Sequence, residues 1–181
     1  EVRMPTIGEW IYYTNFCNKR KTWARGQYTD FLRTIASDFV QRKDEKKMES
    51  IINGDMRSGH EPPVKEIIDR AAPYIHDSFE GEAVLSVGKS LDYIAHGCHG
   101  IVNAMPFTCM PGTIVNAVLK RLRENNQNIP YLHMVYEGAE DTNSMTRMEA
   151  FVHQAREFME RKDAASKSAK PGKHKGNEAH I

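Results

Sequence analysis

The sequence predicts an α/β fold in which helices flank a parallel sheet. Helical and strand-like patterns alternate through the second half of the chain, and the connections between them are short. Short connections of this kind join parallel strands through helical crossovers. Each helix then begins near the carboxyl end of a strand, which is the edge of the sheet where ligands bind in such folds.

Helices are predicted over much of the first half of the chain, whereas residues 1–21 are not assigned to any element. Residues 29–52 carry apolar side chains at helical spacing, interrupted at 41–47 by a run of mixed charge that is typical of a solvated helix face or of a break between two helices. A further helix is expected over 64–71, between prolines that begin and end it. Aromatic side chains gather within residues 10–16, and we expect them to be buried because aromatic rings cover large areas.

The second half contains the alternating pattern on which the fold prediction depends. Gly97 is a natural C′ residue for the first of its helices, and Pro106 ends the first strand because proline cannot donate to a sheet. The second strand is nearly continuous in apolar residues, as in strands covered on both faces. The predicted elements are a helix over 82–96, a strand over 101–105, a helix over 111–122, a strand over 130–136 and a last helix that begins near 142.

One α/β domain is predicted over residues 1–162, followed by a basic tail over 163–181. The tail consists mostly of Lys, Ser, Ala and Gly, so it cannot bury enough apolar area to offset its ordering entropy, and we expect it to be disordered. Because the chain begins with Glu1 rather than Met, we interpret it as a piece of a longer protein.

The composition argues against several classes of function. A net charge of +1 disfavours a dedicated nucleic-acid surface, which is strongly basic. No apolar run is long enough to cross a membrane, and no signal-peptide pattern opens the chain. The three cysteines are too widely spaced for a secreted disulfide framework, so we predict a cytoplasmic protein with free or metal-bound thiols.

The most informative loop lies between the first predicted strand and the helix that follows it. Cys109 is expected at the start of that helix, where unpaired N–H groups and the helix dipole favour the thiolate that binds metal or attacks an electrophile. A tyrosine-phosphatase loop would need an arginine at Val115, and a thioredoxin-like pair would need a second cysteine at Gly112. Both are excluded, and a plain turn that contains a cysteine stays an open alternative.

A pocket is expected at this edge of the sheet. The loops that contain Glu82 and Glu137 should lie beside the Cys109 loop, with Glu140 nearby, because each loop leads into a helix of the alternating pattern. We expect the pocket to be lined by Glu82, Thr108, Thr113 and Glu137.

Histidines outside this loop are given structural interpretations. His96, Cys98 and His99 precede the first strand, so about six residues at ~3.3 Å each, roughly 20 Å, separate them from Cys109. They cannot share one ion with Cys109, and their spacing favours a helix-to-strand turn over a zinc site. His133 falls inside a strand and is predicted to be a core histidine with a hydrogen-bond partner.

Three segments of the sequence resemble a known family. They are GEAVLSVGK at 81–89, NAMPFTCMPGTI at 103–114 and EGAEDTNSMTR at 137–147. The family is the 2-hydroxyacyl-CoA dehydratase-like domain of long CoA-substrate-specific enzyme activase proteins, also described as acyl-CoA dehydratase activase-related. The resemblance covers roughly residues 1–160 and indicates the C-terminal portion of that larger domain.

The resemblance implies a Rossmann-like or flavodoxin-like fold in a cytoplasmic protein of anaerobic metabolism. In the related proteins, cysteines from separate loops hold a [4Fe–4S] cluster, and an ATP-driven activase domain delivers low-potential electrons. Cluster ligation carries over to Cys109 alone, so the other ligands and the ATP-binding activase domains would belong to the remainder of the long chain. An acyl-CoA dehydratase is a further implied partner. By itself the chain is expected to hold no cluster and to have no activity.

Two functions stay open on the sequence alone. In the first, the chain is a redox module in which Cys109 helps to hold a cluster for electron transfer in 2-hydroxyacyl-CoA dehydration. In the second, it is a binding or scaffolding domain that keeps the same fold without a cluster.

Overall fold

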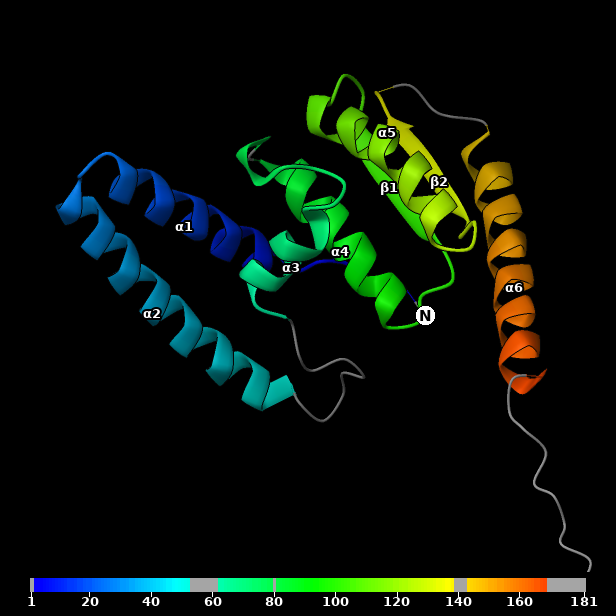
Figure 1. Cartoon of the computed structure of the whole chain (residues 1–181), viewed down its shortest axis with the longest axis horizontal. Helices are drawn as coiled ribbons and strands as arrows, with labels where there is room; N and C mark the ends of the chain where they lie inside the picture. The colour runs from blue at the N-terminus through cyan, green and yellow to red at the C-terminus, as the bar shows by residue number, and fades with distance from the viewer. Residues whose placement is uncertain (1, 53–61, 80, 139–142, 169–181) are drawn as a thin grey trace, which may run out of the picture.

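The computed structural model describes residues 2–52, 62–79, 81–138 and 143–168. Within these residues the chain is mostly helical and contains a small parallel sheet (Figure 1). The first half forms α1 (Ile7–Ala24), α2 (Tyr28–Ile52), α3 (Val64–Ala71) and a short 3₁₀ helix, η1 (Asp77–Phe79). The second half forms α4 (Glu82–Ala95), β1 (Ile101–Pro106), α5 (Met110–Asn125), β2 (Tyr131–Tyr136) and α6 (Ser144–Ser168).

The predicted parallel pairing of the two strands is confirmed. β1 and β2 lie in register from Ile101 opposite Tyr131 to Pro106 opposite Tyr136, with α5 connecting them and packing on both. The prediction that β2 is covered on both faces is wrong, because Met134 is its one fully buried residue and Tyr136 is 53% exposed. The described part of the chain adds no third strand. On the outer edge of β2, the side chain of Arg147 from α6 donates a hydrogen bond to the carbonyl of His133.

The turn between α4 and β1 forms as the glycine pattern predicts. Gly97 has φ +85°, a conformation that glycine adopts without a Cβ penalty. The N–H of Cys98 donates to the carbonyl of Tyr93 (2.9 Å), and the N–H of Gly97 donates to that of Ile94 (3.1 Å). These two bonds satisfy the last carbonyls of the helix in a Schellman arrangement. His96 and Cys98 therefore belong to a helix-to-strand turn, as predicted.

The main core lies where α4 packs between α3 and α5. Apolar side chains recur at helical spacing on all three helices, and each helix turns that face inward. The side chains that are at most 2% exposed there are Ile67, Ala71, Ala83, Val84, Val87, Leu119 and Leu122.

Gly88 allows α3 and α4 to approach closely. A Cβ at this position would lie 2.3 Å from the carbonyl oxygen of Ile67 and 2.6 Å from its Cγ2. We expect Gly88→Ala to lower the free energy of unfolding by about 1–3 kcal/mol, because the two helices must separate despite the better helix propensity of alanine. Urea denaturation followed by circular dichroism measures the change.

A matched control for Gly88→Ala is Ser86→Ala, at an exposed position of the same helix. We expect the control to change stability by less than about 0.5 kcal/mol. If Gly88→Ala were as stable as the wild type, the close packing of α3 on α4 would be wrong.

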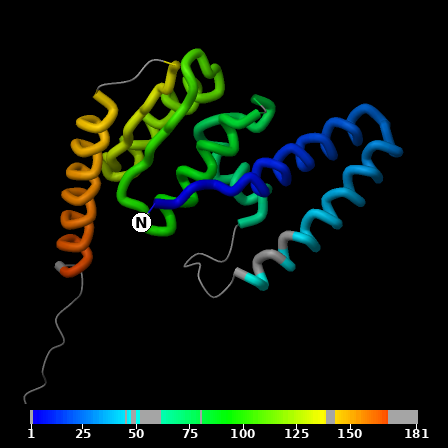
Figure 2. Tube along the Cα trace, turned by 180° about the vertical axis from the view of Figure 1, so that it is seen from behind, coloured from blue at the N-terminus to red at the C-terminus, as the bar shows by residue number. Residues whose placement is uncertain are grey.

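The first two helices form an antiparallel hairpin that extends away from the sheet (Figures 1 and 2). The predicted burial of the aromatic cluster in α1 holds only in part, since Tyr12 and Tyr13 are buried whereas Trp10 is 45% exposed. One face of α1 contacts the core near α3 and α4, and its neighbouring face contacts α2. Most of the large apolar side chains of α2 lie on its exposed surface.

The last helix changes the predicted start of the tail. α6 continues to Ser168, so residues 163–168 are helical rather than disordered. This segment contains no Gly or Pro, and its Ala and Lys residues have high helix propensity, so the helix propagates without apolar contacts. Residues 169–181 lie outside the described residues. Among the helices described, none combines the length and the apolar character needed to cross a membrane.

Candidate functional site

Cys109 occupies the junction predicted for it, between a parallel strand and the helix that follows. It is the N-cap residue of α5, and its Sγ accepts a hydrogen bond from the N–H of Gly112 (3.4 Å). Pro111 lies in the first turn, where a missing N–H costs little. The Oγ1 of Thr113 donates to the carbonyl of Cys109 (2.9 Å), which holds the cap residue against the helix. The sulfur is thus placed at the positive end of α5.

The chain reverses sharply before Cys109. Thr108 has φ +62°, which is unusual for a β-branched residue. The reversal is held by two backbone bonds, from the N–H of Phe107 to the carbonyl of Tyr136 (2.8 Å) and from the N–H of Cys109 to that of Pro106 (3.2 Å). The Cys109 loop is therefore tied to the carboxyl ends of both strands, which is the edge of the sheet that the sequence predicts.

Side chains of β1 also hold the first turn of α5 in place. The Nδ2 of Asn103 donates to the carbonyl of Gly112 (3.1 Å) and lies 3.2 Å from Nδ1 of His133. A Cβ at Gly112 would lie 2.3 Å from Sδ of Met105, so the glycine permits close contact between helix and strand. His133 has the hydrogen-bond partner that the sequence predicts for it, but it is half-buried and does not belong to the core as predicted.

A pocket of about 380 Å³ lies between α1 and the first turns of α4 and α5. The Gly81 and Glu82 positions contribute the start of α4, and Pro111 contributes the start of α5. Helix N-termini carry partial positive charge, which the Glu82 carboxylate opposes. The lining residues from α1 are Trp10, Tyr13, Thr14, Cys17, Asn18 and Lys21.

The predicted pocket residues are brought together only in part. Glu82 lines the pocket with Pro111 of the Cys109 loop, as expected. Thr108 and Thr113 are exposed and do not line it, because the α5 turn directs them to solvent. Glu137 follows β2 beside the Cys109 loop but is exposed, and Glu140 lies outside the described residues. Sequence reasoning missed the contribution of α1, whose Cys17 packs against the core and also lines the pocket.

The described residues do not by themselves make a complete metal site. No group of three or more His, Cys, Asp or Glu side chains in them is arranged to hold a metal ion. A [4Fe–4S] cluster takes four protein ligands as a rule, so the donor set that includes Cys109 does not fit a cluster held by the described residues alone. The zinc alternative is not supported either, since His96 bonds to the carbonyl of Asp92 and His99 packs on Phe158.

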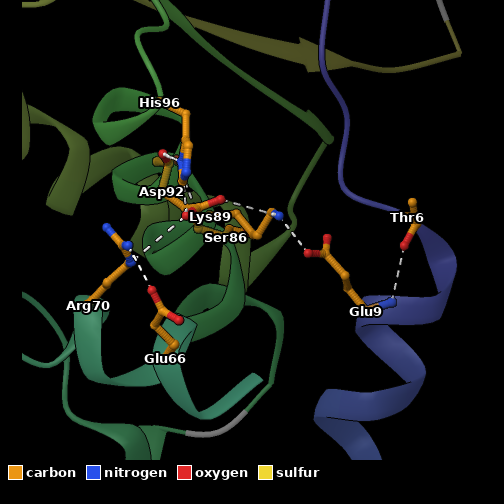
Figure 3. Close-up of polar contacts among 9 residues, drawn as sticks. Thr6, Glu9, Glu66, Arg70, Ser86, Lys89, Asp92 and His96 are labelled. Atoms are coloured by element: carbon orange, nitrogen blue, oxygen red, sulfur yellow. Dashed lines mark hydrogen bonds and ion pairs between the residues drawn. The ribbon is translucent and has the colours of Figure 1, made fainter. Parts of the chain in front are cut away.

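A buried charge cluster joins α1, α3 and α4 (Figure 3). Lys89 Nζ lies 2.5 Å from Oε1 of Glu9 and 3.7 Å from Oδ2 of Asp92, and all three side chains are at most 6% exposed. Arg70 approaches Asp92 at 3.8 Å, and His96 approaches it at 3.3 Å. The sequence holds one signal for it, since Lys89, Asp92 and His96 follow one another at helical spacing.

The geometry of the cluster indicates a structural role. It links residues that are far apart in the sequence and does not line the pocket between α1, α4 and α5. Its charges are compensated within the fold, as buried charges must be.

Comparisons with known proteins add no assignment. No family model, no curated protein and no solved structure gives a significant match to this chain. A function must therefore be proposed from the residues themselves.

Proposed function

We propose that this chain is a dehydratase-like module of a long, cytoplasmic CoA-substrate-specific enzyme activase-like protein, with a Rossmann-like or flavodoxin-like fold. In this proposal it contributes to iron–sulfur-dependent, ATP-driven electron transfer for 2-hydroxyacyl-CoA dehydration. The observation that carries the proposal is the position of Cys109, in the segment that resembles the family, as the cap of a helix that follows a parallel strand. Its sulfur accepts a backbone N–H, as cluster thiolates do.

The proposal assigns one ligand to this chain and leaves the others to the rest of the protein. That division follows from the donor set, because Cys109 has no group of neighbouring ligands among the described residues. In this proposal the chain fixes the position of the Cys109 sulfur. The bonds from Asn103 to Gly112 and from Gly112 to Cys109 fix where the sulfur lies relative to the sheet. Bonds from N–H groups to a ligand sulfur also tune a cluster's reduction potential.

The test is Cys109→Ser in the intact protein, purified without oxygen, with iron and acid-labile sulfide measured per chain. We expect both to fall in parallel, because a serine hydroxyl is a poor replacement for a thiolate ligand. Cys98→Ser is the matched control, since Cys98 is equally half-buried but lies at the opposite end of β1. The control should retain wild-type iron and sulfide. If Cys109→Ser retained as much iron as Cys98→Ser and the wild type, the redox proposal would lose its basis.

The second candidate is a binding or scaffolding domain without a cluster. The incomplete donor set in the described residues favours it, as does the exposed apolar surface of α2. The same measurement separates the candidates, because a scaffolding domain predicts an intact protein whose iron content does not depend on Cys109.

A further inference from the structure

The α1–α2 hairpin is held together by a polar seam. Asp38 is 9% exposed and lies between Nζ of Lys19 (2.7 Å) and Nε of Arg42 (3.2 Å). Burial raises the pKa of Asp38, but the hydrogen bonds and positive charges of Lys19 and Arg42 outweigh it and hold that pKa below its usual value. Nearby, Nδ2 of Asn15 donates to Oε1 of Gln41 (2.7 Å). The hairpin thus uses polar groups over part of its length, where antiparallel helices usually pack apolar ones, and Trp23 of α1 contacts the rings of Tyr28 and Phe31 near the turn.

The apolar residues of α2 lie along a different side of the helix. Tyr28, Leu32, Ile35 and Phe39 are 63, 64, 41 and 72% exposed. They are separated by four, three and four residues, which is the spacing of the a and d positions of a coiled coil. This row, which we call the α2 stripe, is narrow and straight, and it therefore matches the shape of one further helix.

Exposed lysines continue this side of α2 beyond the apolar row. The same alternation of three and four residues leads from Phe39 to Arg42, which Asp38 of the polar seam holds, and then to Lys46 and Glu49. The exposed Lys43 and Lys47 flank Lys46. At 100° per residue, Asp30, Asp38 and Asp44 fall on other sides of the helix. Among the described side chains of α2, the surface around the stripe is therefore apolar at one end and basic at the other.

We propose that the α2 stripe is the docking site for an amphipathic helix of a partner protein, with an apolar seam at a and d positions and acidic residues beside it. A helix of this kind would cover the four exposed apolar side chains and pair its carboxylates with the cations that follow them. This interaction does not depend on Cys109 and stands apart from the proposed redox role.

The charge pattern disfavours the other occupants of such a surface. A second copy of the chain docked in parallel would bring two basic ends together, and like charges at close range are repulsive. A second copy docked antiparallel would offer no carboxylate at the positions of its own stripe to pair with these lysines. Helices that lie on a membrane bury a broad apolar face in the lipid, whereas this stripe has only two apolar positions per heptad.

The test uses a synthetic helix as the probe. A fluorescent peptide of about three heptads, with Leu at a and d and Glu at e and g, is titrated with the full chain at low salt and followed by anisotropy. A matched peptide with Lys in place of Glu measures the contribution of charge. We expect the Glu peptide to bind at least ~10-fold more tightly than the Lys peptide, and added salt to reduce the difference.

Variants of the chain locate the binding surface. Leu32→Asp and Phe39→Asp should each weaken binding of the Glu peptide at least ~10-fold, because each places a negative charge in the apolar contact between the α2 stripe and the peptide. Phe79→Asp is the control, since Phe79 is 59% exposed on η1, away from α2, and this variant should bind as the wild type does. All three positions are exposed, and circular dichroism checks that each variant keeps its helices.

Three results would overturn the proposal. The first is equal binding of the Glu and Lys peptides, and the second is Glu-peptide binding that Leu32→Asp and Phe39→Asp leave unchanged. The third is a different occupant. Either a dimer of the chain that Leu32→Asp dissociates, or binding to phosphatidylserine vesicles that Leu32→Asp abolishes, would assign the stripe to another partner.

Discussion

Lys89→Met is expected to lower the free energy of unfolding by about 3–5 kcal/mol, the largest loss we predict for a single substitution. The Lys89 ammonium lies 2.5 Å from Glu9 and 3.7 Å from Asp92, deep in the fold. Its removal leaves the Glu9 carboxylate buried without a counter-charge. The other oxygen of that carboxylate, Oε2, already lacks a hydrogen-bond partner among the described residues. Chemical denaturation of the purified chain measures the loss.

A double variant separates lost charge from lost packing. Replacing both members of a buried pair with apolar residues of similar volume is often neutral or stabilising, so Glu9→Leu combined with Lys89→Met should recover most of the loss. Asp92 keeps Arg70 and His96 as neighbours in that variant. Lys120→Met, at an exposed position of α5, is the control and should change stability by less than about 0.5 kcal/mol. A loss below about 1 kcal/mol for Lys89→Met would mean that water reaches the pair.

Leu119→Ala is expected to cost about 2–5 kcal/mol. Leu119 is 1% exposed and belongs to the core cluster that α5 shares with α4. Truncation removes buried methyl groups and leaves a cavity that close-packed neighbours fill only in part. The measurement is again the unfolding free energy, with the slope against denaturant checked for a change in two-state behaviour.

The same substitution on α2 is the matched control for Leu119. Leu32 is 64% exposed, so Leu32→Ala removes little buried area and should change the stability of the isolated chain by less than about 0.5 kcal/mol. A cost for Leu32→Ala comparable to that for Leu119→Ala would show that the α2 stripe is buried within the chain. That result would contradict the exposed surface on which the docking proposal depends.

Much of the fold could be predicted from local sequence patterns. The spacing of apolar residues placed α3, α4 and α5 close to their observed bounds, because a helix buries one face and so repeats its pattern every turn. Proline and glycine placed the ends of β1 and α4, because each restricts or permits particular backbone angles regardless of distant contacts. The position of Cys109 at the start of α5 followed from the same local signals.

The candidate site was predictable only where local structure determines it. Glu82 and the Cys109 loop meet because both begin helices at neighbouring positions of the fold. The exposed orientation of Thr108 and Thr113 depends on the φ angle and cap bonds of one tight turn, which composition does not reveal. The contribution of Cys17 could not be predicted, because nothing local indicates where α1 docks.

From residue 29 onward, the sequence by itself determined the order of the main helices and strands, the parallel pairing and the strand-to-helix position of Cys109, whereas it did not assign α1. Only the tertiary structure decided which polar residues are buried and which apolar ones are exposed. Glu9 and Lys89 are 80 residues apart and pair because α1 packs against α4. Leu32 is exposed because α1 meets α2 through Asp38 rather than through the α2 stripe. The physical reason is that helical periodicity is a property of neighbouring residues, whereas burial depends on which element from elsewhere in the sequence packs against each face of a helix.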